Sequence, residues 1–136
     1  MKTINVIIEP GKDGFGVMFK TKGLEDYTSF GETLKEAKKN ARAVLADMQE
    51  SFSDDNMPEA LMGFDPATVK MKFSFMLNHY FKEYKYINVS GLAARIGINS
   101  SLLRQYDKGL AMASENKYIQ IREGLHEVGR ELKEAL

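Results

Sequence analysis

Two glycines bracket the segment that most constrains the fold, GINSSLLRQYDKG at residues 97–109. Gly97 predicts a tight turn, where the missing Cβ relieves the backbone, and Gly109 predicts a left-handed residue that ends a helix. Asn99 has the side chain of a helix N-cap, because its oxygen accepts a hydrogen bond from an N–H two or three residues later. The sequence therefore predicts a short helix whose inward face holds three apolar residues, Leu102, Leu103 and Tyr106.

The other residues of this helix are polar, which predicts an exposed outer face. Arginine can pair with guanine and glutamine with adenine in the major groove of DNA, so an exposed helix with these residue types suits base readout. The candidate DNA-binding residues are Asn99, Ser100, Ser101, Arg104, Gln105 and Lys108. The alternative is an ordinary surface helix in a helical bundle.

The residues before Gly97 predict a second short helix, with Ser90 as its N-cap and Leu92, Ala93 and Ile96 on one side. Small alanines at positions 93 and 94 would let two helices pack closely. Two short helices joined at a glycine match a helix-turn-helix, in which the second helix enters the major groove.

A longer helix follows, capped by Ser114, and its apolar residues recur at steps of three and four: Tyr118, Ile121, Leu125, Val128 and Leu132. This stripe is longer than the core of a small helix-turn-helix needs. We therefore expect a homodimer surface at its far end, formed by Val128, Leu132 and Leu136. A symmetric dimer would place two recognition helices on successive major-groove faces of a palindromic operator.

The net charge is zero, with 19 basic and 19 acidic residues, whereas DNA-binding proteins are usually basic. The charge is more favourable near the predicted recognition helix. Between positions 95 and 122, the basic residues Arg95, Arg104, Lys108, Lys117 and Arg122 outnumber Asp107 and Glu115. This modest excess favours binding as a dimer, in which two weak phosphate-contacting footprints combine.

The first half of the chain has a different pattern. Residues 3–9 are rich in β-branched residues, residues 10–14 form a turn cluster, and residues 15–19 predict the return strand of a hairpin. A third strand is expected near residues 27–30. Thr33 and Glu36 form a capping box that opens a helix reaching Phe52, with a solvated side formed by Lys35, Lys38, Lys39 and Arg42.

Residues 53–66 predict a loop, residues 69–75 alternate as a half-buried strand, and residues 76–86 predict a helix. The order β-β-β-α-β predicts a small antiparallel sheet covered by one helix. The predicted fold class is therefore α+β followed by an all-α helix-turn-helix. The predicted domains are a partner-binding module at residues 1–75 and a DNA-binding domain at residues 76–136.

A hairpin with a Gly-rich turn, followed by SFGETLKEA at residues 29–37, resembles the HicB antitoxin module, a shortened ribonuclease-H-like fold. Residues 97–106, with GLHEVGREL at residues 124–132, resemble the C-terminal DNA-binding region of longer HicB-like proteins. The resemblance covers most of the chain. It departs from the family in one connection: many members have a Pro-Gly loop where residues 20–27 read KTKGLEDY.

This resemblance implies a type II antitoxin that represses transcription of its own operon through the C-terminal region. It also implies that the N-terminal module binds a small RNA-cleaving toxin, HicA, and that the protein forms dimers or larger assemblies. A solo HicB-like regulator without a toxin is equally compatible with the sequence. A further alternative is a protein-binding or RNA-binding module whose helix-turn-helix serves assembly.

An inhibitor of an RNA-cleaving toxin needs an acidic surface that covers the toxin's phosphate-binding site. The candidate partner-binding residues before the first helix are Glu25, Asp26 and Glu32. The candidates at its far end are Asp47 and Glu50, followed by Asp54 and Asp55. The alternative is that these acids only keep the protein soluble.

The sequence predicts no enzyme, catalytic residue, metal site or cofactor. Its N-terminal acids, including Glu9 and Asp13, fall mostly in turns and loops rather than in one cluster. His79 and His126 each lie alone, and we expect the first to pack and the second to be solvated. The aromatic cluster Tyr80, Phe81, Tyr84 and Tyr86 predicts core packing, with base stacking in a single-stranded RNA binder as the alternative.

The chain has no cysteine, which excludes disulfides and thiolate metal sites. It contains no apolar run long enough to span a bilayer, and its first residues lack the basic-then-apolar pattern of a signal peptide. We therefore expect a cytoplasmic protein.

Overall fold

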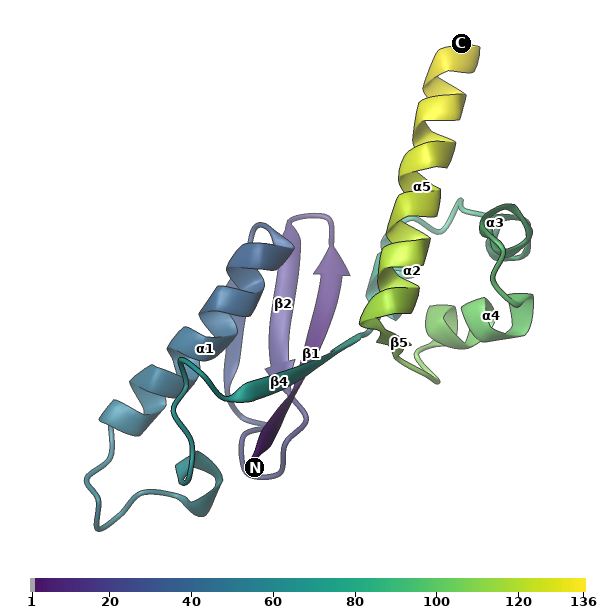
Figure 1. Ribbon diagram of the computed structural model, residues 1–136. Helices are drawn as coiled ribbons and strands as arrows, with labels where there is room; N and C mark the ends of the chain where they lie inside the picture. Colours follow the sequence, from purple (N-terminus) through teal and green to yellow (C-terminus); the bar gives the residue numbers. More distant parts are fainter. Residues whose placement is uncertain (1) are drawn as a thin grey trace. The chain divides into compact units, whose positions relative to one another are not determined.

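The computed structural model describes residues 2–136 and divides the chain into two compact units, one ending at Ser74 and one spanning Phe75–Leu136. The first unit combines a sheet with one long helix, and the second is mainly helical (Figure 1). The chain is therefore α+β, with a C-terminal helical region. No helix within residues 2–136 is long and apolar enough to cross a membrane.

Three strands open the first unit: β1 (Thr3–Gly11), β2 (Gly14–Phe19) and β3 (Thr28–Gly31). β2 is antiparallel to both β1 and β3. Side chains alternate between the two faces of a strand, and in β1 the buried residues are Ile4, Val6, Ile8 and Pro10. In β2 the buried residues are Val17 and Phe19, so these two strands contribute one continuous apolar face.

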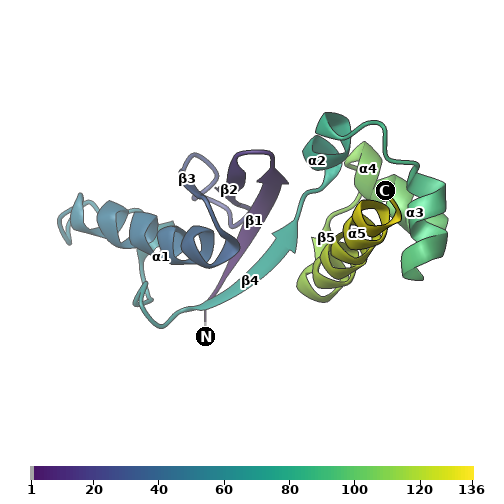
Figure 2. The ribbon, with the colours of Figure 1, turned by 90° about the horizontal axis from the view of Figure 1, so that it is seen from above.

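Helix α1 (Leu34–Glu50) covers this apolar face (Figure 2). As predicted, Thr33 is its N-cap, and the Thr33 hydroxyl oxygen accepts a hydrogen bond from the backbone N–H of Glu36 at 3.1 Å. The buried side of the helix is formed by Ala37, Ala41 and Leu45. The helix ends at Glu50, two residues before the predicted end, and Ser51 is its C-cap.

The segment after α1 is held to the helix by two of its polar side chains. Gln49 Nε2 donates to the carbonyls of Leu61 and Phe64 at 2.8 and 3.1 Å. Arg42 Nη1 donates to the carbonyls of Pro66 and Val69, both at 2.9 Å. The prediction that Arg42 lies on the solvated side of the helix is therefore wrong. The segment also contains one helical turn, η1 (Glu59–Leu61).

The next strand, β4 (Lys70–Phe75), makes the sheet mixed, whereas the sequence predicted an antiparallel sheet. The strand order is β3-β2-β1-β4-β5, and β4 runs in the same direction as β1 (Figure 2). Parallel neighbours need a crossover connection, and α1 with the segment after it provides one. β5 (Ala113–Ser114) was not predicted; it belongs to the second unit, as does Phe75.

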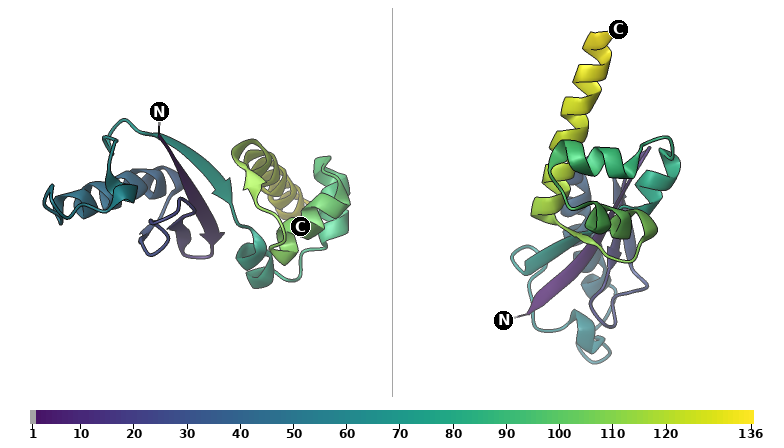
Figure 3. Two further views of the ribbon diagram at one scale, coloured as in Figure 1. Left: turned by 90° about the horizontal axis from the view of Figure 1, so that it is seen from below. Right: turned by 90° about the vertical axis from the view of Figure 1, so that its right-hand side faces the viewer.

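Four helices form the second unit: α2 (Asn78–Glu83), α3 (Val89–Ile96), α4 (Ser100–Lys108) and α5 (Glu115–Ala135) (Figures 1 and 3). α2 is shorter than the predicted helix over residues 76–86. The rings of Phe75 and Tyr118 stack with centroids 4.1 Å apart. Around them lie the other buried apolar residues of this unit: Leu77, Phe81, Leu92, Ala93, Ile98, Leu103, Tyr106, Ala113 and Ile121.

α5 packs closely against α3 at a glycine. An ideal Cβ built on Gly124 would lie 2.1 Å from Ile96 Cγ2 and 2.8 Å from Ile96 Cβ. Real Cβ atoms do not come so close to another carbon atom, so α3 and α5 can cross in this way only if residue 124 is glycine.

Candidate nucleic-acid interface

The turn between α3 and α4 has the predicted backbone. α3 ends at Gly97, whose φ of 76° places it in the left-handed region that glycine adopts without a steric penalty. α3 begins earlier than predicted, because its N-cap is Asn88 and not Ser90. Asn88 Oδ1 accepts a hydrogen bond from the backbone N–H of Gly91 at 2.9 Å. Ser90 therefore lies in the first turn, where its hydroxyl has a different partner.

α4 is capped at both ends by the predicted residues. Asn99 Oδ1 accepts from the backbone N–H groups of Ser101 and Leu102 at 2.9 and 3.2 Å. Gly109 ends the helix with φ of 73°. On the inward side, Leu103 and Tyr106 are buried, whereas Leu102 is only half-buried. The helix is thus fixed in length and in rotation by its own sequence.

The outer face of α4 carries most of the predicted readout residues. Ser101, Arg104, Gln105 and Lys108 are exposed, and Ser100 is half-buried. Asn99 is exposed at the start of the helix, but its side-chain oxygen already accepts the two hydrogen bonds that cap α4. The structure therefore leaves four exposed polar side chains along one side of a nine-residue helix.

Arg104 is held in place by two serine hydroxyls. Its Nη1 donates to Ser90 Oγ at 3.1 Å, and its Nη2 donates to Ser101 Oγ at 3.4 Å. An arginine side chain has five N–H donors, so these contacts leave donors for another partner. The sequence did not indicate the role of Ser90, because the two residues are 14 positions apart.

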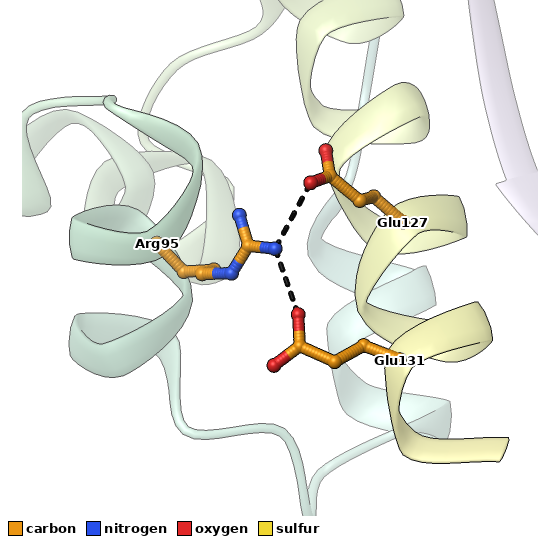
Figure 4. Close-up of polar contacts among 3 residues, drawn as sticks. All are labelled: Arg95, Glu127 and Glu131. Carbon is orange, nitrogen blue, oxygen red and sulfur yellow. Dashed lines mark hydrogen bonds and ion pairs between the residues drawn. The ribbon is translucent and has the colours of Figure 1, made fainter. Parts of the chain in front are cut away.

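Arg95 is engaged within the protein. Its Nη2 donates to Glu127 Oε1 at 3.0 Å and to Glu131 Oε2 at 2.9 Å, which connects α3 to α5 (Figure 4). The hydrogen bonds to Glu131 and then to Glu127 raise the pKa of the guanidinium. The sequence counted Arg95 among the basic residues around the predicted recognition helix, but two carboxylates offset its positive charge.

Arg122 is similar, since its Nη2 lies 2.9 Å from Glu123 Oε1. The predicted basic excess between positions 95 and 122 is therefore smaller at the surface than the count suggested. The acids responsible lie just beyond that window, and Glu127 and Glu131 are four residues apart on one helix face. Their spacing in the sequence was the signal that could have revealed the cluster.

Two lysines that the sequence did not indicate as DNA-binding residues, Lys82 and Lys85, line a hollow together with Lys108 at the end of α4. This hollow of about 390 Å³ in the second unit is lined by Asn78, Phe81, Lys82, Lys85, Ile87, Val89, Asp107 and Lys108. Three of these residues are lysines and one is an aspartate, so the hollow has a basic excess. The short KEYK sequence at residues 82–85 was the available signal.

The predicted partner-binding acids do not form one surface. Glu25, Asp26 and Glu32 are exposed in the segments before α1, whereas Asp47 and Glu50 are exposed in its last turns. A 17-residue helix is about 25 Å long, so the two groups lie near opposite ends of α1. Asp54 and Asp55 are exposed beyond its C-terminal end.

Among these acids, Glu25 has a hydrogen bond from the backbone. One of its carboxylate oxygens accepts a hydrogen bond from the backbone N–H of Gly23. Hydrogen bonds from its own backbone N–H and from that of Gly23 lower the pKa of the carboxyl group. Glu25 is therefore a charged group held in a fixed position on the surface of the first unit.

The histidines and aromatic residues follow the predictions only in part. His79 was expected to pack, but it is exposed, with Nε2 3.1 Å from Glu83 Oε1, one turn further along α2. His126 is exposed, as predicted. Phe81 is buried and packs edge-on against Tyr80 at 5.5 Å, whereas Tyr86 is 81% exposed. Within residues 2–136, no three His, Asp or Glu side chains are placed to hold a metal ion.

The predicted dimer surface is exposed along α5. The inward part of its stripe, Tyr118 and Ile121, is buried, while Leu125 and Val128 are half-buried. Leu132 is 63% exposed, and Leu136 at the end of the helix is fully exposed. Within the second unit, this end of α5 extends past α3 and α4 (Figure 3).

Comparison with known proteins adds no relative. No protein-family model, curated protein or solved structure matches this chain. What the second unit does is therefore inferred from its geometry: two short helices joined by a left-handed glycine, with a capped helix whose outer face is polar.

Proposed function

We propose that the second unit is a helix-turn-helix DNA-binding domain and that the protein regulates transcription by binding an operator. One observation carries this proposal: α4 is buried on one side and presents Ser101, Arg104, Gln105 and Lys108 on the other. A helix with this distribution is the element that reads base edges in the major groove.

The four residues have different roles in this proposal. Arg104 reads a guanine through its O6 and N7 acceptors, and Gln105 reads an adenine through N6 and N7. Lys108 contacts the phosphate backbone, together with Lys82 and Lys85, which line the same hollow. Phosphate contacts set the position of the protein on the duplex, whereas base contacts provide the specificity.

The contacts from Ser90 and Ser101 support the role of Arg104. An exposed arginine normally loses side-chain freedom when it binds, which costs about 0.5–1.5 kcal/mol. Because two hydroxyls already restrain the guanidinium in the free protein, Arg104 should lose less conformational entropy when it binds DNA. The serines thereby act as positioning residues for the proposed base contact.

The test begins with selection of preferred sites from random duplex DNA by the full-length protein. Arg104→Ala should weaken binding to the selected site by about 1–3 kcal/mol and relax specificity at one base pair. Lys108→Ala should weaken binding to all duplexes and reduce the slope of log affinity against log salt by about 1.

Lys133→Ala is the matched control, because Lys133 is an exposed lysine in the last turn of α5 and belongs to neither helix of the proposed helix-turn-helix. Its removal should leave site affinity unchanged. If Arg104→Ala binds the selected site as tightly as the wild type does, then α4 does not read bases through this residue.

We further propose that the first unit binds a small basic protein, as the HicB resemblance implies for a HicA-like toxin. The specific observation is Glu25, an exposed carboxylate that the backbone N–H of Gly23 orients at the surface. Complementary charge would speed association and make it sensitive to salt. Co-expression with the protein of the adjacent open reading frame, followed by a pull-down, is the test.

Glu25→Gln should weaken capture of a basic partner, while Glu115→Gln, in the first turn of α5, should not. If a HicA-like neighbour exists and does not co-purify, the antitoxin part of the proposal fails. If no such neighbour exists, a solo regulator becomes the better interpretation.

A further inference from the structure

The sheet of the first unit has a second face, opposite α1. Cross-strand partners share a face, so Ile7 lies with Met18, and Glu9 lies with Gly16. The same pairing places Thr28 beside Met18 and Phe30 beside Gly16. None of these residues is among the buried core, because the core side chains of β1 and β2 point to α1. We call this the open face.

A basic hollow lies at one side of the open face. Its volume is about 390 Å³, and it is lined by Thr3, Asn5, Val6, Ile7, Lys20, Thr21, Lys22, Lys72 and Ser74. Three lysines and four side chains with a hydroxyl or amide group surround an apolar floor, and no carboxylate lines the hollow. This combination suits a ligand with a negative charge and several hydrogen-bonding groups.

The wall of the hollow is fixed by hydrogen bonds to β1. The backbone N–H of Asn5 donates to Thr21 Oγ1 at 2.8 Å, and the backbone N–H of Lys20 donates to the Asn5 carbonyl at 2.9 Å. The segment that carries Lys20 and Lys22 is therefore tied to the sheet. The charge of Lys22 also acts on Glu25, whereas neither Lys20 nor Lys72 forms an ion pair with a carboxylate within residues 2–136.

An exposed aromatic ring lies on the other side of the same face. Phe30 is 49% exposed, and its Cζ lies 2.6 Å from the position of an ideal Cβ on Gly14, so the ring covers a glycine. Its backbone is also fixed, because Asn40 Nδ2 donates to the Phe30 carbonyl at 2.7 Å. Gly16, its cross-strand partner, has no side chain to cover the ring.

We propose that the open face binds single-stranded RNA, with backbone phosphates at Lys20, Lys22 and Lys72 and an unpaired base stacked on Phe30. Sheets with exposed aromatic rings bind single strands in this manner, because every base has a face that stacks. Thr3, Asn5, Thr21 and Ser74 supply hydrogen-bonding groups for ribose 2′-hydroxyls, which DNA lacks.

The distances across the sheet favour a strand over a single nucleotide. Lys72 on β4 and Phe30 on β3 are three strand positions apart, which corresponds to about 14 Å. Glu9 lies on the open face beside Gly16. Because its carboxylate repels phosphate groups, the RNA phosphates would lie along the lysines, and the unpaired base would stack on Phe30. This inference is independent of the proposed DNA site, which uses different residues in the second unit.

The experiment measures binding of a fluorescent RNA of about ten nucleotides to the full-length protein by anisotropy, across a salt series. Phe30→Ala should lower the affinity by about 5- to 150-fold, the range of one base–aromatic stack, without changing the salt slope. Phe30→Tyr should restore binding. Lys72→Gln should reduce the slope by about 0.7, the value for one phosphate contact in a single strand.

Two controls separate this surface from others. Lys39→Gln removes an exposed lysine of α1, on the opposite side of the sheet, and should leave RNA binding unchanged. Arg104→Ala should also leave RNA binding unchanged, although it is expected to impair DNA binding. If Arg104→Ala abolishes RNA binding while Lys72→Gln and Phe30→Ala do not, the proposal is wrong.

Two further ligands test the choice of ligand. A DNA strand of the same sequence should bind more weakly, and equal affinity would overturn the assignment to RNA. A mononucleotide should bind far more weakly than the strand. If it binds equally well and competes with the strand, the hollow is a nucleotide site and the open face does not bind strands.

Discussion

Two glycines of α5 should respond in opposite ways to the same substitution. Alanine is favoured over glycine within a helix by about 1 kcal/mol, and it also reduces the freedom of the unfolded chain. At Gly129 an added Cβ would meet no atom within 4 Å, so Gly129→Ala should stabilise the second unit by up to about 1 kcal/mol. Gly124 differs because it faces Ile96.

The clash at Gly124 can be estimated from the structure. An added Cβ would lie 2.1 Å from Ile96 Cγ2, whereas carbon atoms in contact prefer about 3.5–4.0 Å. α3 and α5 would have to separate by more than about 1 Å, and overpacking of this kind costs about 1–3 kcal/mol. After the helix-propensity gain, Gly124→Ala should be destabilising by up to about 2 kcal/mol.

Urea unfolding followed by tyrosine fluorescence is the assay, because five of the six tyrosines lie in the second unit and the chain has no tryptophan. Both variants share the effects of helix propensity and of the unfolded chain, so these effects cancel when their free energies of unfolding are subtracted. The remaining difference is the cost of the clash at Gly124. Ile96→Ala in the Gly124→Ala background removes Cγ2 and should recover part of the loss. Equal stabilisation by both alanines would refute the close crossing of α3 and α5.

Three other predictions concern stability and assembly. Gly31→Ala would place a Cβ 2.3 Å from the Ala37 backbone nitrogen, so thermal unfolding should show a loss of about 2 kcal/mol or more, whereas Gly16→Ala, whose nearest contact is 3.8 Å, should be almost neutral. Leu132→Asp should lower both the apparent mass in light scattering and the DNA affinity, and an unchanged mass would place the dimer interface elsewhere. Burial raises the pKa of Tyr118, with the Arg122 charge opposing it, and burial also raises that of Tyr80. The native state therefore keeps these protons when the unfolded chain releases them, so stability should fall as the pH rises above about 10, and Tyr118→Phe should reduce that slope.

The features that the sequence predicted are governed by neighbouring residues. The caps of α4, Asn99 and Gly109, act on backbone groups within a few positions, so their pattern is readable directly. The same holds for Thr33 at the start of α1 and for the alternation of buried residues in β1. Local patterns also indicated which side of α4 is apolar, and hence which residues are exposed.

The features that the sequence did not predict depend on partners far along the chain. Arg42 was expected in solvent, but the carbonyls that it contacts belong to residues 24 and 27 positions away. Arg95 was counted as free positive charge, although Glu127 and Glu131 surround it. The mixed sheet has the same origin, because strand direction beside β1 depends on how the chain returns after α1 and not on the residues of β4.

The most direct test of the central claim concerns the pairing of Arg104 with one guanine. The wild type and Arg104→Ala are each titrated against the selected duplex and against duplexes in which single guanines are replaced by 7-deazaguanine, which lacks the N7 acceptor. We predict that one replacement weakens the wild type severalfold and has no effect on Arg104→Ala, because the lost acceptor and the lost donor belong to the same contact. If every replacement affects the two proteins equally, or if none affects the wild type, α4 does not read the major groove through Arg104.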